Sequence, residues 1–115
     1  MINKIAILLP TRNRLEDFKV FAESWKKTTE GLSVVIVRID NDDKTYDEIK
    51  HDYPEFIYEI GESKPPINLL NELAVKYSQI YAYVNYMEDD CNFNTSGWEN
   101  SGSRLRNCRR GASRI

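Results

Sequence analysis

Three consecutive acids, Glu88, Asp89 and Asp90, follow an apolar and aromatic run over residues 80–87. Neighbouring carboxylates repel one another unless a positive charge lies between them. Mg²⁺ and Mn²⁺ prefer carboxylate oxygens, and Mg²⁺ in proteins is commonly bound by one or two carboxylates together with the phosphates of a substrate. The three acids therefore predict either a metal–phosphate site or, because acidic pairs are common, a solvated loop or the N-cap of a helix.

A second acidic loop follows the β-branched run over residues 33–39. In the stretch RIDNDDKT, Asp40 and Asp42 stand where an aspartate can accept hydrogen bonds from a base N–H group or from ribose hydroxyls. An acid at the end of the second strand has this role in dinucleotide-binding folds. An Asx turn followed by a helix cap explains the same residues, so both interpretations stay open.

The stretch PTRNR, residues 10–14, follows the first apolar run and contains no glycine. Ordinary dinucleotide binding and P-loop hydrolysis are disfavoured, because both depend on glycine-rich loops that let the backbone approach phosphate. Arg12 and Arg14 are suited to contact phosphate. Alternatively, they are surface arginines that pair with Asp17 or with the acidic loop.

The elements that position these loops follow from the apolar pattern. Continuous apolar runs predict strands over residues 4–10, 33–39, 55–60 and 80–87. Helical spacing and stop signals predict helices over residues 15–31 and 64–79, and a short helix that ends before Pro54. This alternation implies an α/β fold, a Rossmann-like open and mainly parallel sheet with flanking helices. Because ligands bind at the carboxyl ends of the strands in such sheets, the three polar loops are expected to converge on one edge.

Composition predicts one domain over residues 1–99 and a basic, disordered tail over residues 100–115. The first range holds all 18 acidic residues and 11 of the 16 lysines and arginines, whereas the tail holds five arginines, no acid and no apolar periodicity. Nucleic acid is not an expected partner, because a base-stacking platform also needs a basic surface and the body of the chain is acidic.

The longest N-terminal apolar run, IAILL, is too short for a signal peptide or a membrane span, so the chain is expected in the cytoplasm. The two cysteines, Cys91 and Cys108, make neither a disulfide framework nor a zinc set. They are expected to be free thiols in a reducing compartment. The oligomeric state is left open, since a four-stranded sheet with an open edge can pair with another copy.

Four stretches occur in an order that resembles family 2 glycosyltransferases of the GT-A fold. They are IAILLPTRNR, VVIVRIDNDDKT, NLLNELAVKYS and YVNYMEDDCNFNTSGWE, and the resemblance covers residues 4–99. The first two resemble the family's opening strands with their loops, and the last resembles its strand with DxD-like acids and a following GW pair. The resemblance implies the nucleotide-binding half of the GT-A fold and a site for a nucleotide-diphosphate sugar, with a UDP-linked donor as the usual expectation.

The resemblance also implies roles for residues at the first two strand ends. Pro10, Thr11 and Arg12 would line the nucleoside pocket. Asp40 or Asp42 would contact the base or the ribose, because the family pattern fits either register.

At the fourth strand end, the resemblance implies a cation. Asp89 and Asp90 would hold Mn²⁺ or Mg²⁺ against the diphosphate, with Asp89 also part of the nucleotide-sugar site and Glu88 beside them. As a Lewis acid, the metal would offset charge on the departing nucleoside diphosphate. The cation of a metal–diphosphate complex is then the positive charge that the three acids require.

The chain departs from the family pattern in three places. Residues 41–44 replace its usual glycine and serine, and Lys64 is the nearest basic residue to its usual arginine near the third helix. No acid follows Glu99, so neither a general base nor an acceptor is identified. The alternative function is a truncated, non-catalytic module that binds nucleotide and metal, and sugar transfer by the 115-residue chain is expected to be absent or very weak.

Overall fold

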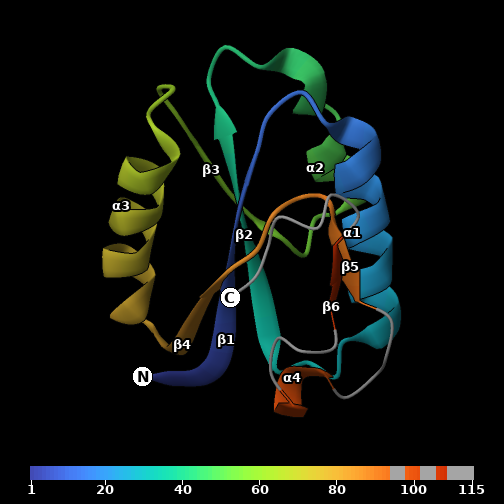
Figure 1. Cartoon of the computed structure of the whole chain (residues 1–115), viewed down its shortest axis with the longest axis vertical. Helices are drawn as coiled ribbons and strands as arrows, with labels where there is room; N and C mark the ends of the chain where they lie inside the picture. Colours follow the sequence, from blue (N-terminus) through green and yellow to red (C-terminus); the bar gives the residue numbers. More distant parts are fainter. Residues whose placement is uncertain (94–97, 102–105, 109–115) are drawn as a thin grey trace.

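The parallel sheet predicted from the sequence is confirmed. The computed structural model describes residues 1–93, 98–101 and 106–108, and its main sheet has the strand order β3-β2-β1-β4. The strands are β1 (Ile2–Thr11), β2 (Ser33–Asp40), β3 (Ile57–Gly61) and β4 (Tyr81–Tyr86). Every neighbouring pair in this sheet is parallel. The order places β1 between β2 and β4 (Figure 1).

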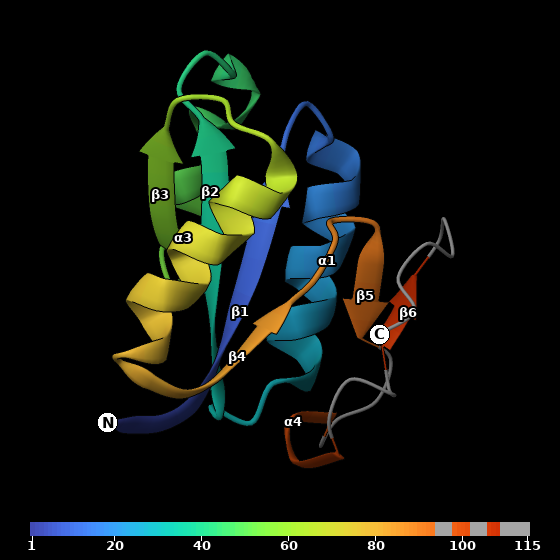
Figure 2. The same cartoon turned by 60° about the vertical axis from the view of Figure 1, so that its left-hand side comes forward.

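Helices cover both faces of the main sheet (Figures 1 and 2). One face carries α1 (Leu15–Thr28), the 3₁₀ helix η1 (Lys44–Tyr46) and α2 (Ile49–Asp52), and the other carries α3 (Pro66–Ser78). The predicted amphipathic pattern explains how α1 packs, because Phe18, Phe21 and Trp25 form one buried stripe. Acids in its first turn and lysines in its last turn complement the helix dipole.

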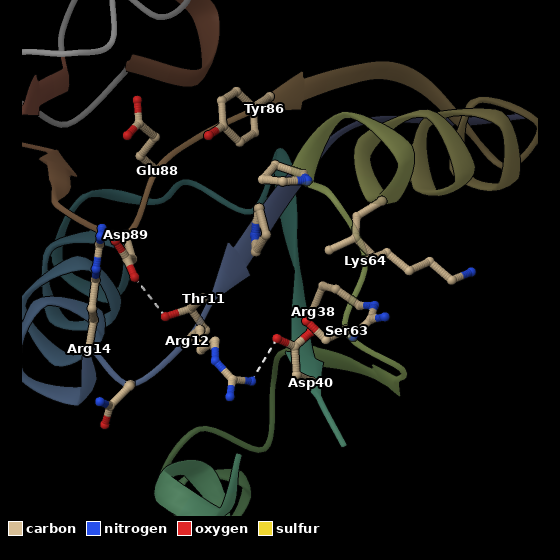
Figure 3. A pocket seen from close by; sticks show the side chains of 14 residues that line it. Thr11, Arg12, Arg14, Arg38, Asp40, Ser63, Lys64, Tyr86, Glu88 and Asp89 are labelled. Carbon is tan, nitrogen blue, oxygen red and sulfur yellow. Dashed lines mark hydrogen bonds and ion pairs between the residues drawn. The ribbon is translucent and has the colours of Figure 1, made fainter. Parts of the chain in front are cut away.

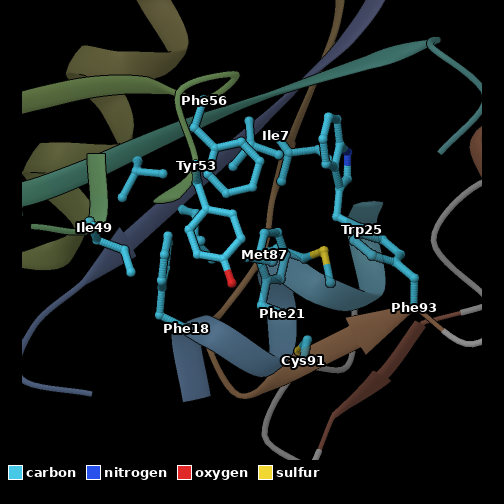
Figure 4. Close-up of a cluster of buried hydrophobic side chains, with 14 of the residues drawn as sticks. Ile7, Phe18, Phe21, Trp25, Ile49, Tyr53, Phe56, Met87, Cys91 and Phe93 are labelled. Atoms are coloured by element: carbon cyan, nitrogen blue, oxygen red, sulfur yellow. The ribbon is translucent and has the colours of Figure 1, made fainter. Parts of the chain in front are cut away.

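The central strand is apolar at nearly every position because both of its faces are covered. Ile7 and Leu9 belong to the cluster under α1 (Figure 4), whereas Ala6 and Leu8 belong to the cluster under α3. Successive side chains of a strand point to opposite faces, so a doubly covered strand needs a continuous apolar run.

A small second sheet lies beside α1 (Figure 2). β5 (Cys91–Phe93) pairs antiparallel with β6 (Arg106–Cys108), and the register sets Cys91 opposite Cys108. The Phe93 amide donates a hydrogen bond to Ser24 Oγ of α1 at 2.9 Å, which fixes β5 against the helix. Cys91 is disulfide-bonded, so the expectation of a free thiol is wrong for this residue.

Part of the expected tail is described. The helix α4 (Trp98–Ser101) and β6 include residues 100–101 and 106–108, whereas residues 102–105 and 109–115 lie outside the described residues. A disordered tail therefore stays a prediction. Within the described ranges, no helix has the length and apolar character needed to cross a membrane.

Glu99 anchors α4 to the turn between α1 and β2, at the end of the sheet opposite the three polar loops. Its side chain is buried, and it accepts hydrogen bonds from the Thr29 hydroxyl at 2.7 Å, from the Glu30 amide at 2.7 Å and from the Ser33 hydroxyl. The neighbouring Trp98 indole donates to Thr28 Oγ1 at 2.9 Å. One carboxylate thus satisfies several donors that the turn would otherwise bury without partners.

We predict that Glu99→Ala lowers the free energy of unfolding by roughly 2–4 kcal/mol, because buried donors lose a charged acceptor. Urea unfolding measures this loss. The control is Glu48→Ala, since Glu48 is exposed and makes no side-chain cap at α2; its effect should stay within about 0.5 kcal/mol. A loss for Glu99→Ala no larger than that of the control would contradict the anchoring role.

Candidate functional site

A pocket of about 500 Å³ lies at the carboxyl ends of the strands of the main sheet (Figure 3). Such a volume lies within the usual range for small-molecule sites. The pocket is lined by Pro10, Thr11, Arg12, Asn13, Arg14, Arg38, Asp40, Ser63, Lys64, Pro66, Leu69, Tyr86, Glu88 and Asp89. The loops after β1, β2 and β4 therefore meet at one edge, joined by the loop between β3 and α3.

The pocket brings together most of the residues singled out from the sequence. Its lining includes Pro10, Thr11, Arg12, Asp40 and Asp89. The two other predicted residues lie outside that lining.

Asp42 and Asp90 lie outside the lining for different reasons. Asp42 is largely exposed, with 60% of its side chain accessible, and it meets the site through Arg12. Asp90 is buried, and the Cys91 amide donates to the Glu88 carbonyl at 3.1 Å, so residues 88–91 form a turn that separates Asp90 from the pocket. Glu88, rather than Asp90, shares the pocket with Asp89.

Arg12 bridges the two aspartates that the sequence left as alternatives. Its Nη1 atom lies 2.8 Å from Asp40 Oδ2 and 2.7 Å from Asp42 Oδ1. The hydrogen bond from Arg12 holds the pKa of Asp42 below its usual value, and the same contacts raise the pKa of Arg12. The pairing of Arg12 with the acidic loop is thus present, and a ligand that approaches either group meets an ion pair.

Arg38 is a lining residue that the sequence analysis missed. It is 7% exposed, and its guanidinium donates to the carbonyls of Glu62 at 2.5 Å, Ile39 at 2.7 Å and Gly61 at 3.3 Å. A Cβ atom at Gly61 would lie 3.2 Å from Arg38 Nη2, so glycine allows this close approach. Arg38 therefore fastens the loop that carries Ser63 and Lys64 to the end of β2. The one available signal was a charged residue inside the apolar run SVVIVRI.

A buried network joins the first loop to the acid after β4. Thr11 Oγ1 donates to Asp89 Oδ2 at 2.8 Å and lies 2.6 Å from the Tyr46 hydroxyl, which accepts from the Arg14 amide at 3.0 Å. The Arg14 guanidinium lies 3.3 Å from Asp89 Oδ1. Burial raises the pKa of Tyr46, so its hydroxyl keeps its proton at neutral pH. Nothing in the sequence linked Tyr46 to the acids.

The acids fit a cation that arrives with a ligand better than a preformed metal cage. Among the described residues, no group of three or more histidine, cysteine or acidic side chains is placed to hold a metal. Glu88 and Asp89 nevertheless share the pocket, and Mg²⁺ commonly uses one or two carboxylates plus substrate phosphates. The pKa of Tyr86 is raised, mainly by burial and then by the nearby carboxylates of residues 88–90. The second effect is the one expected where negative charges gather.

Comparison with known proteins gives matches in structure but none in sequence. No protein-family model matches the chain, and no curated protein matches it. The fold is similar to that of S. aureus TarS, a glycosyltransferase.

Three TarS structures illustrate this similarity, each at 16% identity and over 85% of this chain. The TarS segment 1–349 matches with a TM-score of 0.63 over 31% of that chain. The same segment in complex with UDP matches with a TM-score of 0.60 over 30% of its length, and TarS itself with 0.60 over 18%. The chain has a glycosyltransferase-like fold and spans less than a third of the length of these TarS chains.

We predict that Arg12→Gln raises the pKa of Asp42 toward that of an ordinary aspartate, because the hydrogen bond that favours the carboxylate is lost. NMR titration of the side-chain carboxyl carbons measures the change. Since Arg12 lowers the pKa, the pair stabilises the fold above the unfolded pKa of Asp42, and this small contribution disappears as pH falls through the folded value. An unchanged Asp42 titration would show that the pair does not form in solution.

Proposed function

We propose that this chain is the donor-binding domain of a family 2-like glycosyltransferase and binds a nucleotide-diphosphate sugar, with UDP as the expected nucleoside diphosphate. The observation that carries this proposal is the meeting of the loops after β1, β2 and β4 in one pocket at the carboxyl edge of the sheet. In open α/β sheets, this edge is where ligands bind. The shared fold with TarS, one structure of which contains UDP, supports the choice of ligand.

The charges of the pocket suit such a ligand. Cationic groups come from Arg12, Arg14 and Lys64, and carboxylates come from Asp40 and Asp89. A nucleotide-diphosphate sugar presents phosphates to the cations, and base and hydroxyl donors to the carboxylates. A pocket with both charges is better matched to this molecule than to a simple anion.

The two ends of the ligand are assigned to neighbouring parts of the pocket, which meet where Thr11 donates to Asp89. Pro10, Thr11 and Arg12 line the nucleoside side, where Asp40 accepts hydrogen bonds from the base or ribose. Asp42 acts there through Arg12, which it holds in place by their ion pair. The diphosphate then lies toward Asp89, Glu88 and the fourth strand.

A divalent cation, Mn²⁺ or Mg²⁺, would be held by Asp89, together with either Glu88 from the same pocket or Asp90 from the turn behind it. When bound, the cation supplies Lewis-acid stabilisation of the departing nucleoside diphosphate. The chain's own contribution is to hold the Asp89 carboxylate by the hydroxyl of Thr11 and the guanidinium of Arg14.

A non-catalytic binding module is the second candidate function. The chain spans 31% or less of the TarS chains it matches, and no general base for an acceptor is assigned among its residues. We therefore expect the 115-residue chain to bind the donor without transferring the sugar. For the protein that carries this domain, we propose sugar transfer to an acceptor and a cytoplasmic location.

Calorimetric titration with UDP, with and without Mn²⁺, tests the proposal. We expect binding that depends on metal and is weakened about tenfold or more by Asp89→Asn, which is at least ~1.4 kcal/mol of binding free energy. Asp52→Asn on α2 is the matched control and should leave affinity unchanged, because Asp52 does not line the pocket.

Asp90→Asn is measured in the same series. A loss equal to that of Asp89→Asn assigns Asp90 to the cation, and an unchanged affinity assigns the second carboxylate to Glu88. Folded wild-type protein that binds no UDP under either condition would contradict the proposed function.

A further inference from the structure

We infer that Tyr46 is a positioning residue of this pocket, whose buried hydroxyl orients Thr11 and, through Thr11, the carboxylate of Asp89. The inference rests on the proposed function, because it concerns the carboxylate to which we assign the cation. Tyr46 itself does not line the pocket. Its effect on a ligand would therefore pass entirely through other side chains.

The direction of each hydrogen bond in the network follows from counting protons. The Asp89 carboxylate can only accept hydrogen bonds, so Thr11 donates its single hydroxyl proton to Asp89 Oδ2, at 2.8 Å. The contact between Thr11 and Tyr46, at 2.6 Å, then requires Tyr46 to be the donor. The Tyr46 oxygen is left to accept from the Arg14 amide, at 3.0 Å.

The three bonds therefore run in one direction, from the Arg14 amide through Tyr46 and Thr11 to Asp89. Hydrogen bonds arranged in this way polarise one another, and each strengthens the next. Thr11 is 6% exposed, Tyr46 1% and Asp89 3%, so the chain is shielded from competing water. The Thr11 oxygen is therefore held from two sides, by the proton that it donates to Asp89 and by the proton that it accepts from Tyr46.

The ring of Tyr46 is held rigidly enough to set that orientation. It packs edge-to-face on Phe18, with ring centroids 5.7 Å apart and an interplanar angle of 84°. The η1 turn that carries Tyr46 is capped by Asp43, which accepts from the Thr45 amide at 3.0 Å and from the Asn13 amide at 2.7 Å.

The two loops also meet through the backbone of residues 13 and 14. Asn13 adopts a positive φ of 51°, in the left-handed region where asparagine is one of the few residues besides glycine that is commonly found. Asp43 holds the Asn13 amide, and Tyr46 holds the next amide, that of Arg14. The loop after β2 thus fixes the shape of the loop after β1, which in turn orients Asp89 after β4.

The test compares Tyr46→Phe with Tyr58→Phe. Each substitution removes one tyrosine hydroxyl that donates a hydrogen bond. In the control, the lost bond is the one from Tyr58 to the Tyr53 carbonyl, at 2.7 Å. Tyr58 belongs neither to the pocket lining nor to the network that leads to Asp89. Calorimetry with UDP and Mn²⁺ should show about tenfold weaker binding for Tyr46→Phe, the usual scale for the loss of a partner behind a metal ligand. Any weak UDP binding that persists without metal should be equal in Tyr46→Phe and the wild type, and Tyr58→Phe should match the wild type under both conditions.

Equal metal-dependent affinities for the two variants would overturn the inference. If the wild type binds no UDP, the proposed function fails, and the inference is judged by NMR alone. A shift of the Asp89 carboxyl carbon and faster exchange of the Arg14 amide in Tyr46→Phe, but not in Tyr58→Phe, support it; unchanged signals overturn it.

If Tyr46→Phe does not fold, the inference is tested by NMR on the wild-type protein, through the hydroxyl proton of Tyr46. A slowly exchanging Tyr46 hydroxyl proton with cross-peaks to Thr11 supports the positioning role. Its absence overturns it.

Discussion

The pocket depends on the parallel pairing of β1 with both of its neighbours. The register sets Thr11 opposite Ile39 on one side and Leu8 opposite Tyr86 on the other. The Met87 amide continues the second pairing by donating to the Leu8 carbonyl at 3.0 Å. Because parallel strands end at the same edge, this register alone brings together three loops that are far apart in the sequence. The apolar residues on both faces of β1 bury it between the two helical layers, and a shift by one residue would exchange the side chains packed under α1 with those packed under α3.

The charged side chains at this edge form ion pairs; they do not form a surface of one sign. Arg12 lies between Asp40 and Asp42, and Arg14 lies beside Asp89. Asp40, Asp42 and Asp89 each have an arginine beside them before a ligand arrives, and this positive charge offsets part of the repulsion among the acids. A ligand with both phosphates and hydroxyl donors can exchange partners with each pair, whereas a simple anion would satisfy only the arginines.

Much of the fold could be predicted from the sequence because buried parallel strands and amphipathic helices have distinct apolar patterns. Several strands and helices begin or end at other residues than predicted, at positions where tertiary contacts decide the boundary. β1 begins at Ile2, because the Ile2 amide donates to the Ile80 carbonyl at 2.8 Å. α1 ends at Thr28, before the expected stop at Gly31, since Thr29 is already extended. β3 begins at Ile57, because Phe56 packs into the aromatic cluster instead.

The site was predictable only as far as strand ends could be recognised. Thr11, Arg12, Asp40 and Asp89 were singled out at predicted strand ends, Pro10 was singled out through the family resemblance, and all five line the pocket. The roles of Arg38 and Tyr46 depend on carbonyls and hydroxyls contributed by distant segments, which no local pattern reveals. The disulfide at Cys91 was missed for the same reason, since it follows from the pairing of β5 with β6.

The most direct test of the central claim is to follow the backbone amides by NMR during a titration with UDP and Mg²⁺. We expect shifts concentrated in the loops around the pocket, over residues 10–14, 38–40, 61–64 and 86–89. Residues 29–33, at the opposite end of the sheet, should change little. Shifts centred on that opposite end, or none at all in a folded protein, would contradict a nucleotide site at the carboxyl edge.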